Sequence, residues 1–238
     1  SAGIIAALGT TFAMLAALLL LTQWLQLVEG ASPIESGIKL IPVALAGAVA
    51  SLAAPPLARV VGARTVLASG LGLAGIGLLA VGLGPDEVTY PLVLTAMLLV
   101  GAGTGSLAIA SAMVMMGSPE DKAGNAGALE ETSYELGGTL GVAVLGSVSA
   151  LVYRTHLQDS AALQQAGPEA VRHAEDSLGA AVATADELGL PRLAADAGEA
   201  FTASLQVAGV AGGLLMLAVA ATVFVLTPRG TDITGGAH

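Results

Sequence analysis

Three carboxylates lie close together in a segment that otherwise has the composition of a membrane-spanning helix. Glu130, Glu131 and Glu135 fall within residues 124–152. On an α-helix Glu131 and Glu135 are four residues apart and share a face, whereas Glu130 is rotated by about 100° from Glu131. We therefore expect Glu131 and Glu135 to face one cavity.

Carboxylates in such a segment need a functional reason, because they are costly there. A charged side chain at the centre of a bilayer costs about 3 kcal/mol on insertion scales. Protonating an ordinary glutamate, with a pKa of about 4.3, costs roughly 3.7 kcal/mol at pH 7. Since the two costs are similar, the group can hold a proton when dry and release it when water or a cation arrives. The pattern predicts a proton-coupled site at Glu135 and Glu131, with a less defined role for Glu130.

The composition is that of an integral membrane protein built from α-helices. Of the 238 residues, 55% are hydrophobic and only 11% are charged, and the mean hydropathy is +0.82, whereas soluble domains have roughly 25% charged residues. The 32 glycines favour close helix packing. Cysteine is absent, which excludes disulfides and thiolate metal sites. The net charge of −10 argues against a nucleic-acid partner. Runs long enough to cross a bilayer, about 20 residues each, occur at 2–28, 38–58, 66–84, 90–116, 124–152 and 202–227.

These runs divide the chain into four parts. We expect five transmembrane helices in residues 1–153, an acidic loop in 154–201, a last transmembrane helix in 202–228 and a polar tail in 229–238. Gly and Pro residues divide the loop into two or three short helices, which we expect to form a hairpin over the membrane surface. His156 and His173 lie in this loop at a spacing that matches no metal motif, so we interpret them as surface residues. The chain starts without Met or a signal peptide, and we expect it to be a fragment of a longer chain.

Polar residues near the carboxylate helix and at the end of the first run are candidates for a cavity lining. Gln23 and Gln26 follow the first apolar run, and Tyr134 lies among the acids. Trp24, between the glutamines, is typical of an anchor at the membrane interface. In the fourth run Gly101 and Gly105 favour a helix-contact pair rather than a phosphate-binding loop, because no Lys follows them.

Six crossings place both termini on one side of the membrane. Basic residues are equally frequent in the loops of the two sides, so their count alone does not set the orientation. The short loops on the side of the termini favour cytoplasmic ends. Arg59 and Arg64, in a tight loop there, indicate either a cytoplasmic edge or a gating contact.

The run 123–146 closely resembles the penultimate helix of the fourteen-span drug/proton antiporters of the major facilitator superfamily, the group of quaternary-ammonium exporters. Trp24-Leu25-Gln26, followed by Ser32 to Gly37, is similar to that family's ninth helix and the start of its tenth. The loop 55–67 resembles the superfamily's loop signature, except that Arg59 stands where Asp is expected.

The resemblance implies that this chain is the C-terminal six-helix half of a major facilitator fold. It implies a bacterial cytoplasmic membrane, cytoplasmic ends, and an extracytoplasmic helical loop between the last two helices. It also implies that Glu131 and Glu135 act in proton coupling and in recognition of cationic drugs, and Glu130 matches the family as well. The implied partners are protons, lipophilic cations, the lipid bilayer and the N-terminal half of the same transporter.

The leading hypothesis is therefore efflux of lipophilic cations by alternating access, driven by the proton gradient without a cofactor. A relative that moves lipids or other amphiphiles remains an alternative. An intramembrane hydrolase with two carboxylates is disfavoured, because no other apolar run contains Asp, Glu or His to supply a partner from a second helix. We expect a transporter and not an enzyme.

Overall fold

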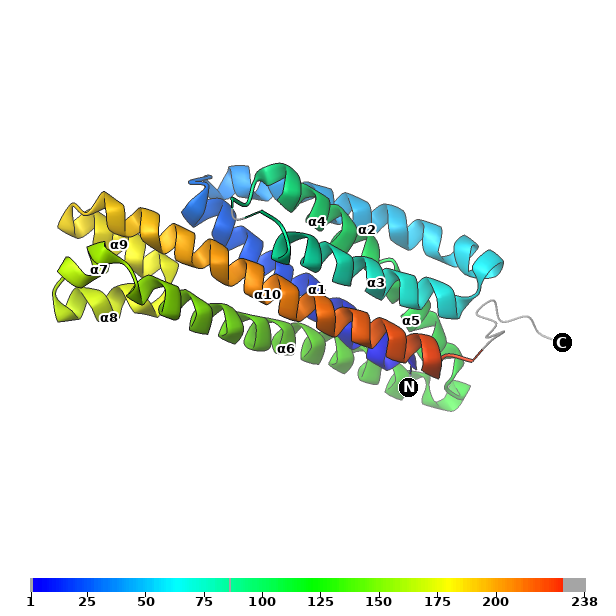
Figure 1. Cartoon of the computed structure of the whole chain (residues 1–238). Coiled ribbons are helices and arrows are strands. Elements are labelled where there is room, and N and C mark those ends of the chain that lie inside the picture. The colour runs from blue at the N-terminus through cyan, green and yellow to red at the C-terminus, as the bar shows by residue number, and fades with distance from the viewer. Residues whose placement is uncertain (1, 86, 229–238) are drawn as a thin grey trace.

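The computed structural model describes residues 2–85 and 87–228, and every regular element in these ranges is helical (Figure 1). Three short helices form one end of the molecule, α7 (Ala161–Gln165), α8 (Pro168–Asp176) and α9 (Leu178–Leu188). We call this end the hairpin end. The long elements are α1 (Ala2–Gln23) with a π-helical turn (Trp24–Val28), α2 (Pro33–Val61), α3 (Ala63–Gly82), α4 (Tyr90–Gly103) with α5 (Ser106–Met116), α6 (Ala123–Gln158) and α10 (Pro191–Leu226).

Six segments of the described chain are long and apolar enough to cross a membrane, which confirms the six predicted spans. They alternate in direction, so that α1 begins and α10 ends at the end opposite the hairpin end (Figure 1). The last two are longer than the apolar runs, since α6 continues to Gln158 and α10 begins at Pro191. The predicted cytoplasmic tail, 229–238, lies outside the described residues.

The turn between the first two spans is formed by local hydrogen bonds. Ser32 Oγ accepts from the Glu35 backbone N–H at 3.3 Å, and Glu35 Oε2 accepts from the Ser32 N–H at 2.8 Å. This reciprocal pair caps α2, with Pro33 at its first position. The other end of α2 meets α3 at Gly62, whose φ of +86° favours glycine.

Glycines let the spans approach each other closely. A Cβ at Gly137 of α6 would overlap the carbonyl oxygen of Leu8, and one at Gly141 would overlap that of Phe12. Small residues at such contacts replace the hydrophobic driving force that a bilayer does not supply. α1 is accordingly fixed against one side of α6.

The fourth span is broken, which the sequence did not predict. The Thr104 N–H donates to the Gly101 carbonyl at 2.9 Å, and the Gly105 N–H donates to the Ala102 carbonyl at 3.2 Å. These bonds span three residues and separate α4 from α5. The predicted contact role of Gly101 and Gly105 is confirmed, because a Cβ at either position would collide with α2.

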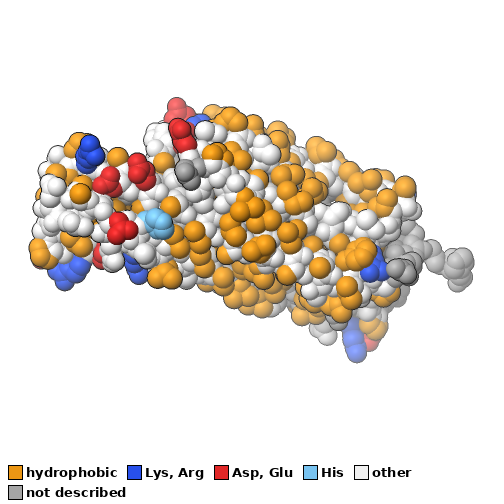
Figure 2. Space-filling model, in the orientation of Figure 1, with side chains coloured by type: hydrophobic (Ala, Val, Ile, Leu, Met, Phe, Trp, Pro, Cys, Tyr) orange, Lys and Arg blue, Asp and Glu red, His pale blue; other side chains and the backbone are white. Residues whose placement is uncertain are grey.

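The hairpin end is attached to the ends of α6 and α10. The Tyr153 hydroxyl of α6 donates to the Ala174 carbonyl of α8 at 3.0 Å, and its ring meets that of Phe201 edge-on. Figure 2 shows apolar side chains over the middle of the molecule and charged ones gathered at the hairpin end. Trp24 is only 1% exposed, so the predicted interface anchor is instead packed inside the protein.

Candidate functional site

Glu131 and Glu135, the carboxylates predicted to act together, lie on one side of α6, and Glu130 lies on another. Glu131 and Glu135 are both exposed, one helical turn apart, at a spacing along the axis of about 6 Å. Within the described chain neither has a hydrogen-bond or ion-pair partner. Ser133 and Gly137, each two residues further on and thus about 200° round the helix, are buried. The structure therefore directs these two acids away from the packed side of α6.

Glu130 has a different environment. It is half-buried, and its Oε1 accepts a hydrogen bond from the hydroxyl of Tyr134, one turn further along α6. Tyr134 is half-buried and packs against the apolar core. The predicted difference in orientation between Glu130 and Glu131 thus corresponds to a paired and an unpaired carboxylate.

The neighbouring hydroxyl groups are already bonded within α6. Thr132 Oγ1 donates to the Ala128 carbonyl at 2.7 Å, and Ser133 Oγ donates to the Leu129 carbonyl at 2.7 Å. Hydroxyls bonded to their own helix in this way do not supply a donor to a carboxylate on the exposed side. Thr132 and Ser133 therefore give Glu131 and Glu135 no hydrogen-bond partner.

Gln23 and Gln26 are not brought to the carboxylates. Both are half-buried, at the end of α1 and in the π-helical turn. Thr11 of α1 is level with Gly137 of α6, and Gln23 is twelve residues further along, which is about 18 Å on a helix. A cavity lined by both groups would therefore extend over much of the membrane thickness.

The basic loop between α2 and α3 lies at the end opposite the hairpin end. The Arg64 guanidinium stacks on the ring of Phe224 in α10 at 3.8 Å from its centroid, whereas Arg59 is exposed. Arg64 consequently ties this loop to the last span.

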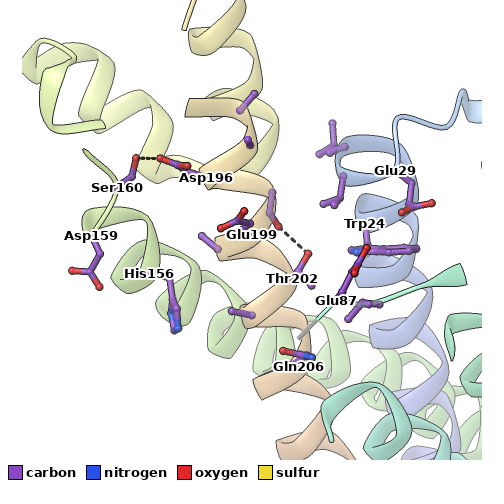
Figure 3. A pocket seen from close by; sticks show the side chains of 18 of the residues that line it. Trp24, Glu29, Glu87, His156, Asp159, Ser160, Asp196, Glu199, Thr202 and Gln206 are labelled. Carbon is purple, nitrogen blue, oxygen red and sulfur yellow. Dashed lines mark hydrogen bonds between the residues drawn. The ribbon is translucent and has the colours of Figure 1, made fainter. Parts of the chain in front are cut away.

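A pocket of about 940 Å³, which sequence reasoning missed, lies at the hairpin end and takes three of its five acids from the predicted acidic loop 154–201 (Figure 3). Its walls are the π-helical turn after α1, the loop before α4, the end of α6 and the start of α10. His156 is exposed in its wall, as predicted for a surface residue, and its Nδ1 lies 2.9 Å from the Val152 carbonyl oxygen. Among the described residues no group of three His, Cys, Asp or Glu side chains could hold a metal ion.

Comparison with known proteins places this helical bundle. The model of the Major Facilitator Superfamily matches residues 1–142, which include the carboxylates of α6. The chain belongs to the major facilitator superfamily.

Members of this superfamily with related sequences carry names of drug export and resistance. The chain is 30% identical over 213 residues to the multidrug efflux pump LfrA of Mycolicibacterium smegmatis, covering 88% of the chain and 42% of LfrA. It is 30% identical over 187 residues to the methyl viologen resistance protein SmvA of Salmonella typhimurium, covering 78% and 37%. It is 33% identical over 162 residues to the multidrug resistance protein Stp of Mycobacterium tuberculosis, covering 68% and 30%. The chain thus spans about two fifths of the length of LfrA and a smaller share of SmvA and Stp.

Proposed function

We propose that this chain is the C-terminal six-helix half of a proton-coupled exporter of lipophilic cationic drugs, of the fourteen-span antiporter group. The observation that carries the proposal is the unpartnered pair Glu131 and Glu135 on the exposed side of a membrane-spanning helix. The names of LfrA, SmvA and Stp support drug efflux in particular rather than lipid transport. The membrane would be the bacterial cytoplasmic membrane, with both ends of this segment in the cytoplasm.

The exposed side of α6 calls for a covering partner other than lipid. Unpaired carboxylates against hydrocarbon are costly, and such residues almost always face a bundle interior or a water-filled cavity. In transporters built from two repeat-related halves the binding site lies at the interface between them. The match covers only 42% of LfrA, so LfrA is long enough to contain a second half of similar size. We infer that this half covers Glu131 and Glu135 and that the two acids line the transport path by which access alternates.

The chemistry of exchange follows from the spacing of the acids. Two carboxylates one turn apart repel each other, so that one of them tends to keep a proton while the cavity is empty. A cation that enters interacts favourably with the charged form and displaces that proton. Proton and drug then compete for the same oxygens, which couples their movements.

The proton gradient supplies the energy for this exchange. Moving one unit charge across the membrane is worth about 2.3 kcal/mol per 100 mV. Export of a cation against an inside-negative potential is therefore uphill, and proton entry offsets it without a bound cofactor.

The test is Glu135→Gln in the full-length transporter, because the amide preserves volume and hydrogen bonding but cannot titrate. We expect efflux of ethidium from energised vesicles to fall at least tenfold while expression and folding are unchanged. Glu187→Gln, on the exposed surface of α9, is the matched control and should leave efflux unchanged. Wild-type efflux by a normally folded Glu135→Gln protein would remove Glu135 from the coupling role.

A further inference from the structure

The pocket at the hairpin end is separate from the carboxylate side of α6 and carries a strong negative charge. Five of the side chains in its described lining are acidic, and His156 is the one basic type among them. The acids come from facing walls, as Figure 3 shows for Glu29 at the end of the π-helical turn and Glu199 on α10. The acidic set is Glu29, Glu87, Asp159, Asp196 and Glu199.

Most of this charge is not neutralised within the described chain. The Ser160 hydroxyl donates to Asp196 Oδ2. The other four carboxylates have neither a hydrogen-bond nor an ion-pair partner among the described side chains. An open cavity lined by one sign of charge raises the local concentration of the opposite ion.

A second observation, independent of the acids, concerns Trp24. Its side chain, in the π-helical turn, contributes to the pocket wall (Figure 3), is 1% exposed, and leaves Nε1 buried without a hydrogen-bond partner among the described residues. A buried indole N–H usually finds an acceptor, and an unpaired one costs free energy. The indole ring is also the aromatic surface that favours cations most. Trp24 therefore leaves, in the wall of the pocket, a donor that no described group satisfies.

The dimensions indicate a bulky ligand rather than a metal ion. No group of three His, Cys, Asp or Glu side chains within the described residues lies close enough together to hold a metal. The volume of about 940 Å³ is within the range of small-molecule pockets, about 300–1,000 Å³. Apolar side chains such as Leu27 and Val88 complete the lining.

We propose that this pocket binds bulky organic cations that also carry a hydrogen-bond acceptor, held by the dispersed carboxylates and by Trp24. The pocket lies at the hairpin end, where a cation exported along α6 would leave the protein. Its use as a release site rests on the proposed function, whereas the binding itself does not.

The experiment measures equilibrium binding to the purified full-length transporter in detergent. A background of Glu131→Gln with Glu135→Gln silences the proposed site on α6. Two probes are compared, rhodamine 6G, whose ester carbonyl accepts a hydrogen bond, and tetraphenylphosphonium, which has no acceptor. Both should still bind in this background, more weakly as ionic strength rises.

Neutralising the pocket tests the role of charge. Each exposed carboxylate contributes about fivefold to the affinity in a water-like dielectric. Glu29→Gln, Glu87→Gln and Glu199→Gln together should weaken the binding of both probes about a hundredfold. The matched control, which neutralises Glu169, Asp186 and Glu187 on the exposed surface of α8 and α9, should change it less than twofold.

Trp24→Phe tests the donor within a single variant. We expect it to weaken the binding of rhodamine 6G about fivefold more than that of tetraphenylphosphonium, since only rhodamine 6G loses a hydrogen bond. The proposal is overturned if the α6 background alone abolishes binding, if the pocket and control variants lose equal affinity, or if Trp24→Phe affects both probes equally. If the α6 background instead leaves efflux intact, the proposed function fails while the binding result for the pocket stands.

Discussion

The carboxylate side of α6 and the pocket at the hairpin end are both rich in acids, but they hold them in opposite ways. Glu131 and Glu135 lie one turn apart on one membrane-spanning helix, where a standing charge is costly. The pocket collects its five acids from separate segments at an open, charged end of the molecule (Figures 2 and 3). Charge is inexpensive there, whereas the two acids of α6 need a covering partner other than lipid. We propose that carboxylates attract cations at the pocket and exchange them for protons on α6.

The largest effect is expected where α6 packs against α1, because this contact holds the carboxylate side of α6 in place. We expect Gly141→Ala to reduce efflux more than tenfold through loss of assembled protein, because the new methyl group overlaps the Phe12 carbonyl of α1. Overpacking of this kind costs about 1–3 kcal/mol. Thermal unfolding monitored by size exclusion checks the loss. Gly146→Ala is the control and should not lower the unfolding temperature, because no atom of another described helix lies within 4 Å of the added Cβ. Equal unfolding temperatures for the two variants would show that close contact with α1 is not required.

The pairing of Glu130 with Tyr134 sharpens the contrast within α6 itself. Removing the donor hydroxyl in Tyr134→Phe should lower efflux about fivefold, since the partly buried carboxylate then lacks its partner. Glu130→Ala, which removes the acceptor, should have a similar effect. The double variant should be no worse than either single variant, because both remove one interaction. Multiplied losses in the double variant would mean that the two residues act independently.

The smallest effect is expected at the hairpin end. Replacing residues 161–189, which hold α7 to α9, by a flexible linker should keep ethidium efflux within about threefold of wild type. The acids there are exposed, and their field is screened over about 8 Å at physiological salt. Complete loss of efflux with normal membrane insertion would instead make the hairpin end a gate.

Much of the fold could be predicted because a bilayer sets the length of the elements. Apolar runs of about 20 residues located all six spans. The outer ends of α6 and α10 could not be located in this way, since they are polar and are held by tertiary contacts such as that of Tyr153 with Ala174. The burial of Trp24 and the break at Thr104 depend on neighbouring helices, which local composition does not describe.

In the candidate site, too, the features set by local helical spacing could be predicted, and those set by tertiary contacts could not. The helical period alone predicted that Glu131 and Glu135 share a side and that Glu130 does not. The bond between Tyr134 and Glu130 follows the i, i+4 spacing that was visible in the sequence. The pocket had no such signal in the sequence. Glu29, Glu87 and Glu199 are far apart along the chain and line one pocket only because the fold brings their segments to the hairpin end.

The most direct test of exchange on α6 measures protons rather than transport. Addition of a cationic drug to the detergent-solubilised full-length transporter in weak buffer should acidify the medium, as the cation displaces the proton shared by Glu131 and Glu135. Glu131→Gln should release fewer protons. It should also weaken the binding of divalent cations more than that of monovalent cations, because a second positive charge gains most from a second carboxylate. Unchanged proton release together with an unchanged preference for divalent cations in Glu131→Gln would contradict exchange by a pair of acids.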